Sequence, residues 1–133
     1  MSQENVEIVL RQFEFWSEGN LDAWADCYDR EVVVTAPEGW PEGEVSQGLE
    51  AWRRQAERLR DSWHEARVEV DDIRAVGRDR VVTRIRYVTT GKDAGISFDT
   101  SMASAFFLCD GKIFRAQYSW DFADALKAAG LRE

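Results

Sequence analysis

The spacing of apolar residues changes near residue 66, and this change restricts the fold more than any other feature of the sequence. Before it, apolar residues recur every three or four positions, as they do on one face of an α-helix. After it, apolar and polar residues alternate, as they do in strands with one buried face. The chain has 133 residues, the length of one domain, so we expect residues 1–133 to form a single unit.

Helices are predicted over most of the first half. The first covers residues 3–18 and carries its apolar stripe at Val6, Val9, Leu10, Phe13 and Trp16. The others cover residues 21–29 and 49–63. Between them, β-branched residues predict a strand over 31–35, and three glycines with both prolines predict a loop over 36–48.

Four strands are predicted after the change in spacing, followed by a short helix over residues 122–129. Three turns separate the strands: Gly77-Arg78-Asp79, Gly91-Lys92-Asp93 and Asp110-Gly111. The last of these is typical of a two-residue hairpin. The order of elements predicts an α+β fold with a curved, mostly antiparallel sheet wrapped around the N-terminal helices. The space between sheet and helices either packs shut or remains a pocket.

The charge of the chain argues against two classes of partner. Its net charge is −8 and its pI is near 4.7, whereas nucleic acids and anionic membranes attract basic surfaces. We therefore expect neither nucleic acid nor a membrane as a partner. The acidic N-terminus does not resemble a signal peptide, and two cysteines make no disulfide framework, so we expect a cytoplasmic protein.

Aromatic residues are unusually frequent, with six Trp, seven Phe and three Tyr. Large rings line apolar binding pockets, but they also fill cores. The sequence leaves these two interpretations open for each ring.

Four segments, in order, are similar to the SnoaL-like branch of the nuclear-transport-factor-2-like superfamily. They are Trp16–Trp24, Gly48–Trp52, Asp110–Ile113 and Trp120–Phe122. The resemblance implies a cone-shaped α+β barrel with an apolar pocket, and a homodimer formed through the outer face of the sheet. It also implies kinship with polyketide cyclases, ketosteroid isomerases, epoxide hydrolases and dehydratases.

The acid–base residues of these relatives are missing from the corresponding positions. Where the cyclases carry an inward His and Asp, counting from Gly111 gives Ser104 and Tyr118. Where the isomerases carry their acid and base, this chain has Ala103 and Ala36.

The epoxide hydrolases use an Asp-Arg-Asp relay. Arg84, Arg86 and Asp99 are present here, but the alternation of the strands directs all three away from the pocket.

The remaining polar candidates are few. Tyr118 is the first catalytic or ligand-orienting candidate, with Ser104 beside it, although Tyr118 also fits a core position. Asp121 is the second, although helix capping also explains it. His64 is the only histidine and fits a surface role, so we expect no metal site and no cofactor.

Two functions are consistent with these patterns. The first is binding of a small apolar or polycyclic molecule, with cofactor-free proton transfer such as isomerisation, cyclisation or dehydration. The ligand-binding residues would be Trp16, Tyr28, Trp40, Trp52, Tyr87, Met102, Ser104, Phe106 and Tyr118. The second is a non-catalytic dimerisation domain whose cone is filled by its own rings. A pocket of roughly a few hundred cubic ångströms would favour the first.

Overall fold

The computed structural model describes residues 2–37, 39–40, 45–63, 65–91 and 97–130. Its N-terminal elements are α1 (Ser2–Glu18), α2 (Leu21–Ala25), β1 (Tyr28–Thr35), β2 (Val45–Gln47) and α3 (Leu49–Asp61). The later elements are β3 (Glu65–Val76), β4 (Arg80–Thr90), β5 (Ser97–Cys109), β6 (Lys112–Ser119) and α4 (Phe122–Ala128). The predicted α+β class is confirmed.

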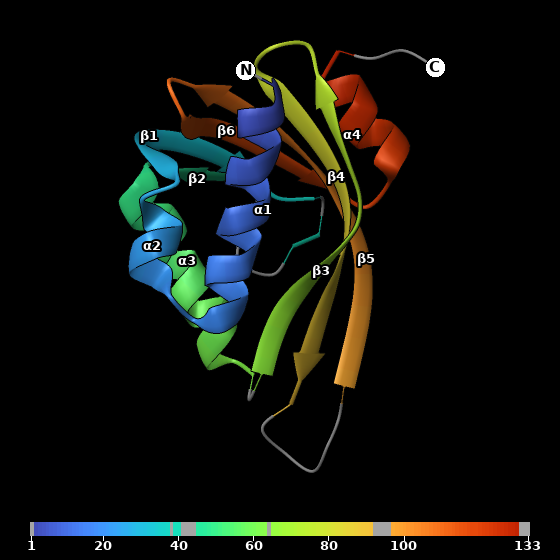
Figure 1. The fold of residues 1–133 in the computed structure, drawn as a ribbon. Coiled ribbons are helices and arrows are strands. Elements are labelled where there is room, and N and C mark those ends of the chain that lie inside the picture. The colour runs from blue at the N-terminus through green and yellow to red at the C-terminus, as the bar shows by residue number, and fades with distance from the viewer. Residues whose placement is uncertain (1, 38, 41–44, 64, 92–96, 131–133) are drawn as a thin grey trace.

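All six strands belong to one curved sheet, in the order β2-β1-β6-β5-β4-β3 (Figure 1). Neighbouring strands are antiparallel except β1 and β6, which are parallel. In the described part of the chain β2 and β3 form the two edges, so the sheet does not close into the barrel that the resemblance implied. Helices α1, α2 and α3 instead cover its concave side (Figure 1).

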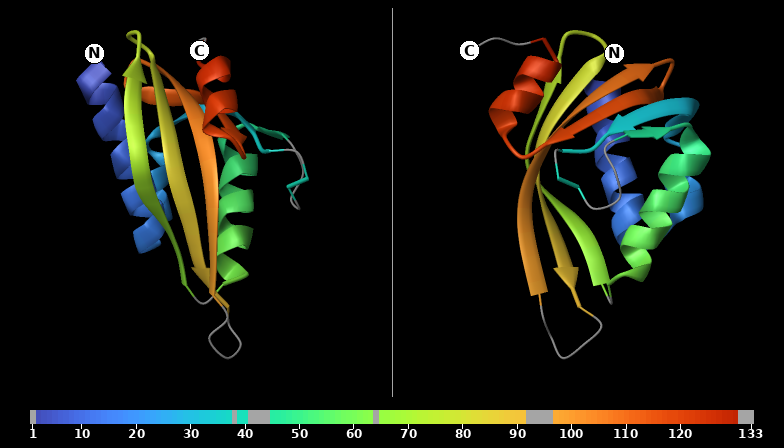
Figure 2. Two further views of the ribbon diagram at one scale, coloured as in Figure 1. Left: turned by 90° about the vertical axis from the view of Figure 1, so that its right-hand side faces the viewer. Right: turned by 180° about the vertical axis from the view of Figure 1, so that it is seen from behind.

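Helix α4 lies on the opposite face of the sheet from α1 (Figure 2). Ala125 and Leu126 of α4, with Ala129 directly after the helix, pack against Val82 and Ala105 on that outer face. The larger core lies on the concave side and includes rings from α1, α2, β1 and β5. The sheet therefore separates a small outer core from the large one that surrounds the candidate site.

The predicted second helix, 21–29, extends too far. Helix α2 ends at Ala25, and Tyr28 begins β1, where it pairs with Ile113 of β6. Asn20 caps the helix by accepting a hydrogen bond from the Ala23 backbone N–H. The local spacing that placed Tyr28 on a helix was overridden by strand pairing with a segment far along the chain.

The loop predicted over 36–48 also contains a strand, β2, which pairs antiparallel with β1. The Asp110-Gly111 hairpin is confirmed: both residues have positive φ, 51° and 78°, as this type of turn requires. None of the helices in the described ranges is both long and apolar enough to span a membrane.

Candidate functional site

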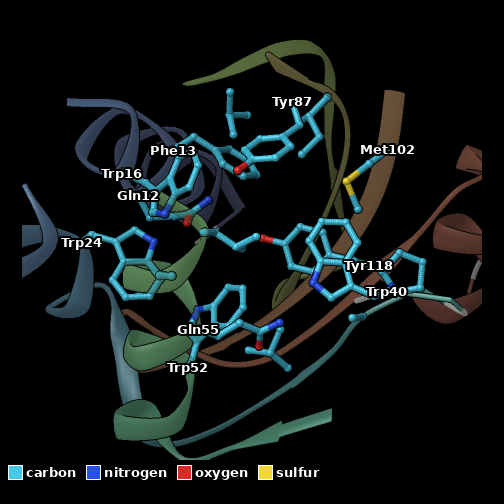
Figure 3. A pocket seen from close by; sticks show the side chains of 17 residues that line it. Gln12, Phe13, Trp16, Trp24, Trp40, Trp52, Gln55, Tyr87, Met102 and Tyr118 are labelled. Atoms are coloured by element: carbon cyan, nitrogen blue, oxygen red, sulfur yellow. The ribbon is translucent and has the colours of Figure 1, made fainter. Parts of the chain in front are cut away.

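An apolar pocket lies between the concave face of the sheet and helices α1 and α3 (Figure 3). Its volume is about 80 Å³, several times the roughly 10–15 Å³ that one water molecule needs. It is smaller than the few hundred cubic ångströms that would favour small-molecule binding by size alone, and smaller than the roughly 300–1,000 Å³ of pockets for drug-sized ligands. Its walls are Gln12, Phe13, Trp16, Trp24, Val34, Ala36, Pro37, Trp40, Trp52, Gln55, Ala56, Leu59, Val68, Ile85, Tyr87, Met102 and Tyr118.

Most of the predicted ligand-binding residues line this pocket. Those that do are Trp16, Trp40, Trp52, Tyr87, Met102 and Tyr118, and Tyr28, Ser104 and Phe106 do not. The alternation of the strands explains the agreement, because inward positions on β4, β5 and β6 face the helices. The rings are in mutual contact, as where Trp52 lies 6.2 Å from Tyr118 between ring centroids.

Ser104 has a different partner from the one expected. It is opposite Tyr118 in the register of β5 and β6, as predicted. Its hydroxyl, however, forms a hydrogen bond with the Thr83 hydroxyl on β4, and both side chains are completely buried. The pair of hydroxyls predicted to orient a ligand is therefore reduced to Tyr118 alone.

Phe106 and Tyr28 support the pocket from behind its walls. Phe106 packs edge-on against Phe13 and Tyr118, with centroids 5.6 and 6.0 Å apart. Tyr28 donates a hydrogen bond from its hydroxyl to Gln12 Oε1 at 2.7 Å. Both residues therefore position wall residues without lining the cavity.

Asp121 lies away from the pocket. It is exposed at the start of α4, which packs on the outer face, and its carboxylate makes no capping hydrogen bond. Its backbone carbonyl accepts hydrogen bonds from the Ala125 N–H and the Ser119 hydroxyl. The structure does not bring Asp121 together with Tyr118 as an acid–base pair facing the same cavity.

Two amides of the pocket wall, Gln12 and Gln55, were not among the residues predicted from the sequence. Gln12 follows Val9 by three positions and precedes Trp16 by four, so it lies on the buried stripe of α1. Gln55 has the same relation to Trp52 and Leu59 on α3. A polar residue inside an otherwise apolar stripe is the signal that would have found both.

Three buried polar atoms of the pocket wall make no hydrogen bond to any described residue: Gln12 Nε2, Trp52 Nε1 and Tyr87 Oη. Buried polar groups are nearly always paired, so such atoms call for an explanation. Gln12 is only 1% exposed, and Figure 3 shows its amide at the wall of the pocket. By contrast, Gln55 Oε1 accepts a hydrogen bond from the Ser46 hydroxyl at 2.6 Å.

The tyrosines around the pocket are held in their neutral form. Burial raises the pKa of Tyr118, and it raises the pKa of Tyr87 to about 12, against a smaller opposing effect of Arg60. Burial likewise raises the pKa of Tyr28, and the nearby indole groups of Trp52 and Trp24 only partly offset this. At neutral pH each hydroxyl is therefore a hydrogen-bond donor and not a general base.

Arg60 of α3 lies against Trp16, one of the residues of the pocket wall. Its guanidinium lies 5.0 Å from the centre of the Trp16 ring and donates to the Trp16 and Ala66 carbonyl oxygens. It therefore ties the C-terminal end of α1 to α3 and β3. It is also the charged group that acts on Tyr87.

The described residues of the pocket wall include no carboxylate and no imidazole. Ala36, at the position expected for an isomerase base, does line the pocket, but Ala103, at the acid position, packs on the outer face beneath α4. Arg86 also faces outward, as predicted, and pairs with Asp99 at 3.0 Å.

A metal site is not found in the described ranges, where no three His, Cys, Asp or Glu residues are grouped to hold an ion. His64 lies outside the described residues. The chemistry of the visible wall is therefore that of hydrogen-bond donors set among apolar rings.

A curved sheet packed on three helices around an apolar pocket defines a class of cone-like α+β domains. The model of the SnoaL-like domain family matches residues 9–116, most of the chain. The protein therefore belongs to the SnoaL-like family, as the four sequence segments indicated. No curated protein matches the chain.

Solved structures with the same fold share little sequence with this chain. One is a protein of ketosteroid isomerase-like fold from Catenulispora acidiphila, in complex with trimethylamine (TM-score 0.74, 20% identity, covering 95% of this chain and 94% of that one). Another is TerC, co-crystallised with polyporic acid (TM-score 0.77, 16% identity, covering 96% of this chain and 99% of that one). A third is IdmH of Streptomyces antibioticus, a candidate polyketide cyclase (TM-score 0.75, 20% identity, covering 94% of this chain and 97% of that one). At these identities the likeness establishes the fold alone.

Proposed function

We propose that this protein binds a small, mostly apolar molecule in the pocket between α1, α3 and the sheet. The observation that carries the proposal is a ring-lined cavity that the protein's own side chains leave open, with the Tyr118 and Tyr87 hydroxyls in its wall. A domain whose cone served only as a core would gain stability by filling this space, because cavities are destabilising.

The wall chemistry favours binding over catalysis. Proton abstraction needs a base that is ionised near neutral pH, and burial keeps these tyrosines protonated. Neutral hydroxyls can still stabilise negative charge that develops on a ligand oxygen. Any reaction would thus be a cofactor-free proton transfer in which the ligand or solvent supplies the base, as in an isomerisation, cyclisation or dehydration.

Two further features belong to the proposal. The cysteines Cys27 and Cys109 are free thiols, which fits a reducing cytoplasm. A homodimer through the outer sheet face would have to form around α4 and the ion pairs of Arg86 with Glu69, Asp71 and Asp99. Sedimentation velocity at two salt concentrations tests that dimer.

Toluene is a suitable probe of the pocket, because dry apolar cavities bind simple arenes. We expect saturable binding to the wild-type protein by ligand-observed NMR. Ala56 is 1% exposed and lines the pocket, so Ala56→Leu should fill part of the cavity and weaken toluene binding at least about ten-fold. Equal binding to both proteins would place the site elsewhere, and no binding to the wild type would contradict the proposal.

The natural ligand can be sought separately. Native mass spectrometry of protein purified from its own host would reveal a co-purified small molecule as an added mass. Loss of that mass in Ala56→Leu would assign it to this pocket.

A further inference from the structure

Tyr28 fixes the orientation of the Gln12 side chain. A tyrosine hydroxyl can donate or accept, and here it donates to Gln12 Oε1 at 2.7 Å in a buried hydrogen bond. Among side-chain amides, the oxygen accepts and the nitrogen donates, so this bond assigns the two ends of the Gln12 amide. The Nε2 end is the one left without a partner among the described residues.

A second donor of the same wall is also unpaired. The Trp52 indole N–H is buried and lies close enough to the Tyr28 hydroxyl to favour its ionised form, but it makes no well-formed hydrogen bond within the described part of the chain. An indole N–H and an amide NH₂ can donate but cannot accept. Tyr87 Oη, the third unpaired atom, can donate as well. The wall therefore has unused donors, whereas the acceptor of Gln12 is already occupied.

From this arrangement we propose that the pocket selects ligands bearing a hydrogen-bond acceptor, and that Gln12 is the specificity-determining residue, held in its donating orientation by Tyr28. The inference rests on the function proposed above and names the class of ligand for that pocket. The ligand is an uncharged aromatic molecule with a carbonyl or similar acceptor, for which Gln12 Nε2 and Trp52 Nε1 supply donors.

The size of the cavity limits this class further. The volume of about 80 Å³ is about half of the roughly 150 Å³ of an engineered cavity that binds benzene, so a single ring with a short substituent already requires the walls to move, and a polycyclic system requires a larger movement. The described wall offers no carboxylate to pair with a ligand cation. A buried ammonium ion would therefore lack the compensation it needs.

Two probes of nearly equal shape separate the acceptor from the apolar contact. Acetophenone carries a carbonyl oxygen, and α-methylstyrene carries a methylene group in the same place. We expect the wild-type protein to bind acetophenone about ten-fold more tightly, measured by isothermal titration calorimetry or competition NMR.

Variants then locate the preference. Gln12→Met removes the donor and retains the length of the side chain, so the preference should fall to about two-fold or less with α-methylstyrene affinity kept. Trp52→Phe should reduce it partly. Tyr28→Phe frees the amide to rotate and should also reduce it, whereas a merely structural role of Tyr28 would weaken both probes equally.

A matched control exists on the same helix. Asn5 is also a buried amide of α1, but its side chain donates to the Arg78 carbonyl oxygen at 2.8 Å, away from the pocket. Asn5→Leu should cost stability and leave the ratio of the two affinities unchanged.

The outcomes distinguish the two proposals. Equal wild-type affinities for the two probes would overturn the donor inference while leaving the pocket proposal intact, since α-methylstyrene would still bind. An unchanged preference in folded Gln12→Met would also overturn it. Failure of both probes to bind would contradict the pocket proposal and the inference together. The wild-type comparison decides the matter even where a variant fails to fold.

Discussion

Thr83 and Ser104 face each other on neighbouring strands of the sheet, with their hydroxyl groups hydrogen-bonded and no part of either side chain exposed. Such a pair is stable because each hydroxyl satisfies the other in a place that water does not reach. It also explains why Ser104, although it points inward, contributes no hydroxyl to the pocket.

Removing one member of this pair should cost more than removing both. Ser104→Ala leaves the Thr83 hydroxyl buried without its partner, which should lower the free energy of unfolding by about 1–3 kcal/mol. The double variant Ser104→Ala/Thr83→Val should recover part of that loss, as measured by chemical denaturation. Additive losses would show that the two hydroxyls do not depend on each other.

Tyr118→Phe should weaken binding of acetophenone with little change in melting temperature. Among the described residues no hydrogen bond to the Tyr118 hydroxyl is found, so its removal deprives the fold of no bond, and the ring contacts with Trp52 and Phe106 remain. Calorimetric titration of the variant measures the loss of acetophenone affinity, and thermal unfolding of the same sample measures the change in melting temperature. A large drop in stability would show that this oxygen is structural.

Trp16→Ala should destabilise the protein by about 3–5 kcal/mol. Trp16 is 7% exposed and packs between the Arg60 guanidinium and the Tyr87 ring, whose centroid is 5.5 Å away. Trp120 is a matched control, because it is 46% exposed and the same change there should cost far less. A loss below about 1 kcal/mol at Trp16 would contradict its assignment to the packed wall.

The three tyrosines should titrate at abnormally high pH in the folded protein. Burial raises the pKa of Tyr28, Tyr87 and Tyr118, that of Tyr87 to about 12, whereas an unfolded chain titrates near pH 10. Because the folded-state pKa is raised, the contribution of these buried neutral tyrosines to the free energy of unfolding is complete below about pH 10. It is lost as the pH rises from there through the folded-state pKa.

Tyrosinate absorbance during an alkaline titration measures this effect. We expect no tyrosinate signal in the folded protein where the same chain in guanidinium chloride is already half ionised. Tyrosine ionisation near pH 10 without unfolding would show that the rings are accessible to solvent.

Most of the fold could be predicted from the sequence, because helices and strands depend on residues two to four positions apart. The first and third helices, the four long strands and the Asp110-Gly111 hairpin all follow from such local spacing. The end of α2 and the strand β2 did not follow from it. Both depend on pairing with β1 or β6, which no local pattern encodes.

Part of the candidate site could also be predicted from local spacing. Inward-facing Tyr87, Met102 and Tyr118 follow from strand alternation, and the sequence was enough to place them in the wall. It did not reveal which polar groups have partners.

By itself, the sequence determined an aromatic-rich α+β domain of the SnoaL-like family, with other residues at the positions where its enzymatic relatives carry their acids and bases. Only the tertiary structure decided the partners of its buried polar groups. Thr83 is hydrogen-bonded to Ser104, and Tyr28 is hydrogen-bonded to Gln12 Oε1, which leaves Gln12 Nε2 without a partner among the described residues. Hydrogen bonds form only within about 3 Å, and residues far apart in sequence reach that distance only when the chain has folded.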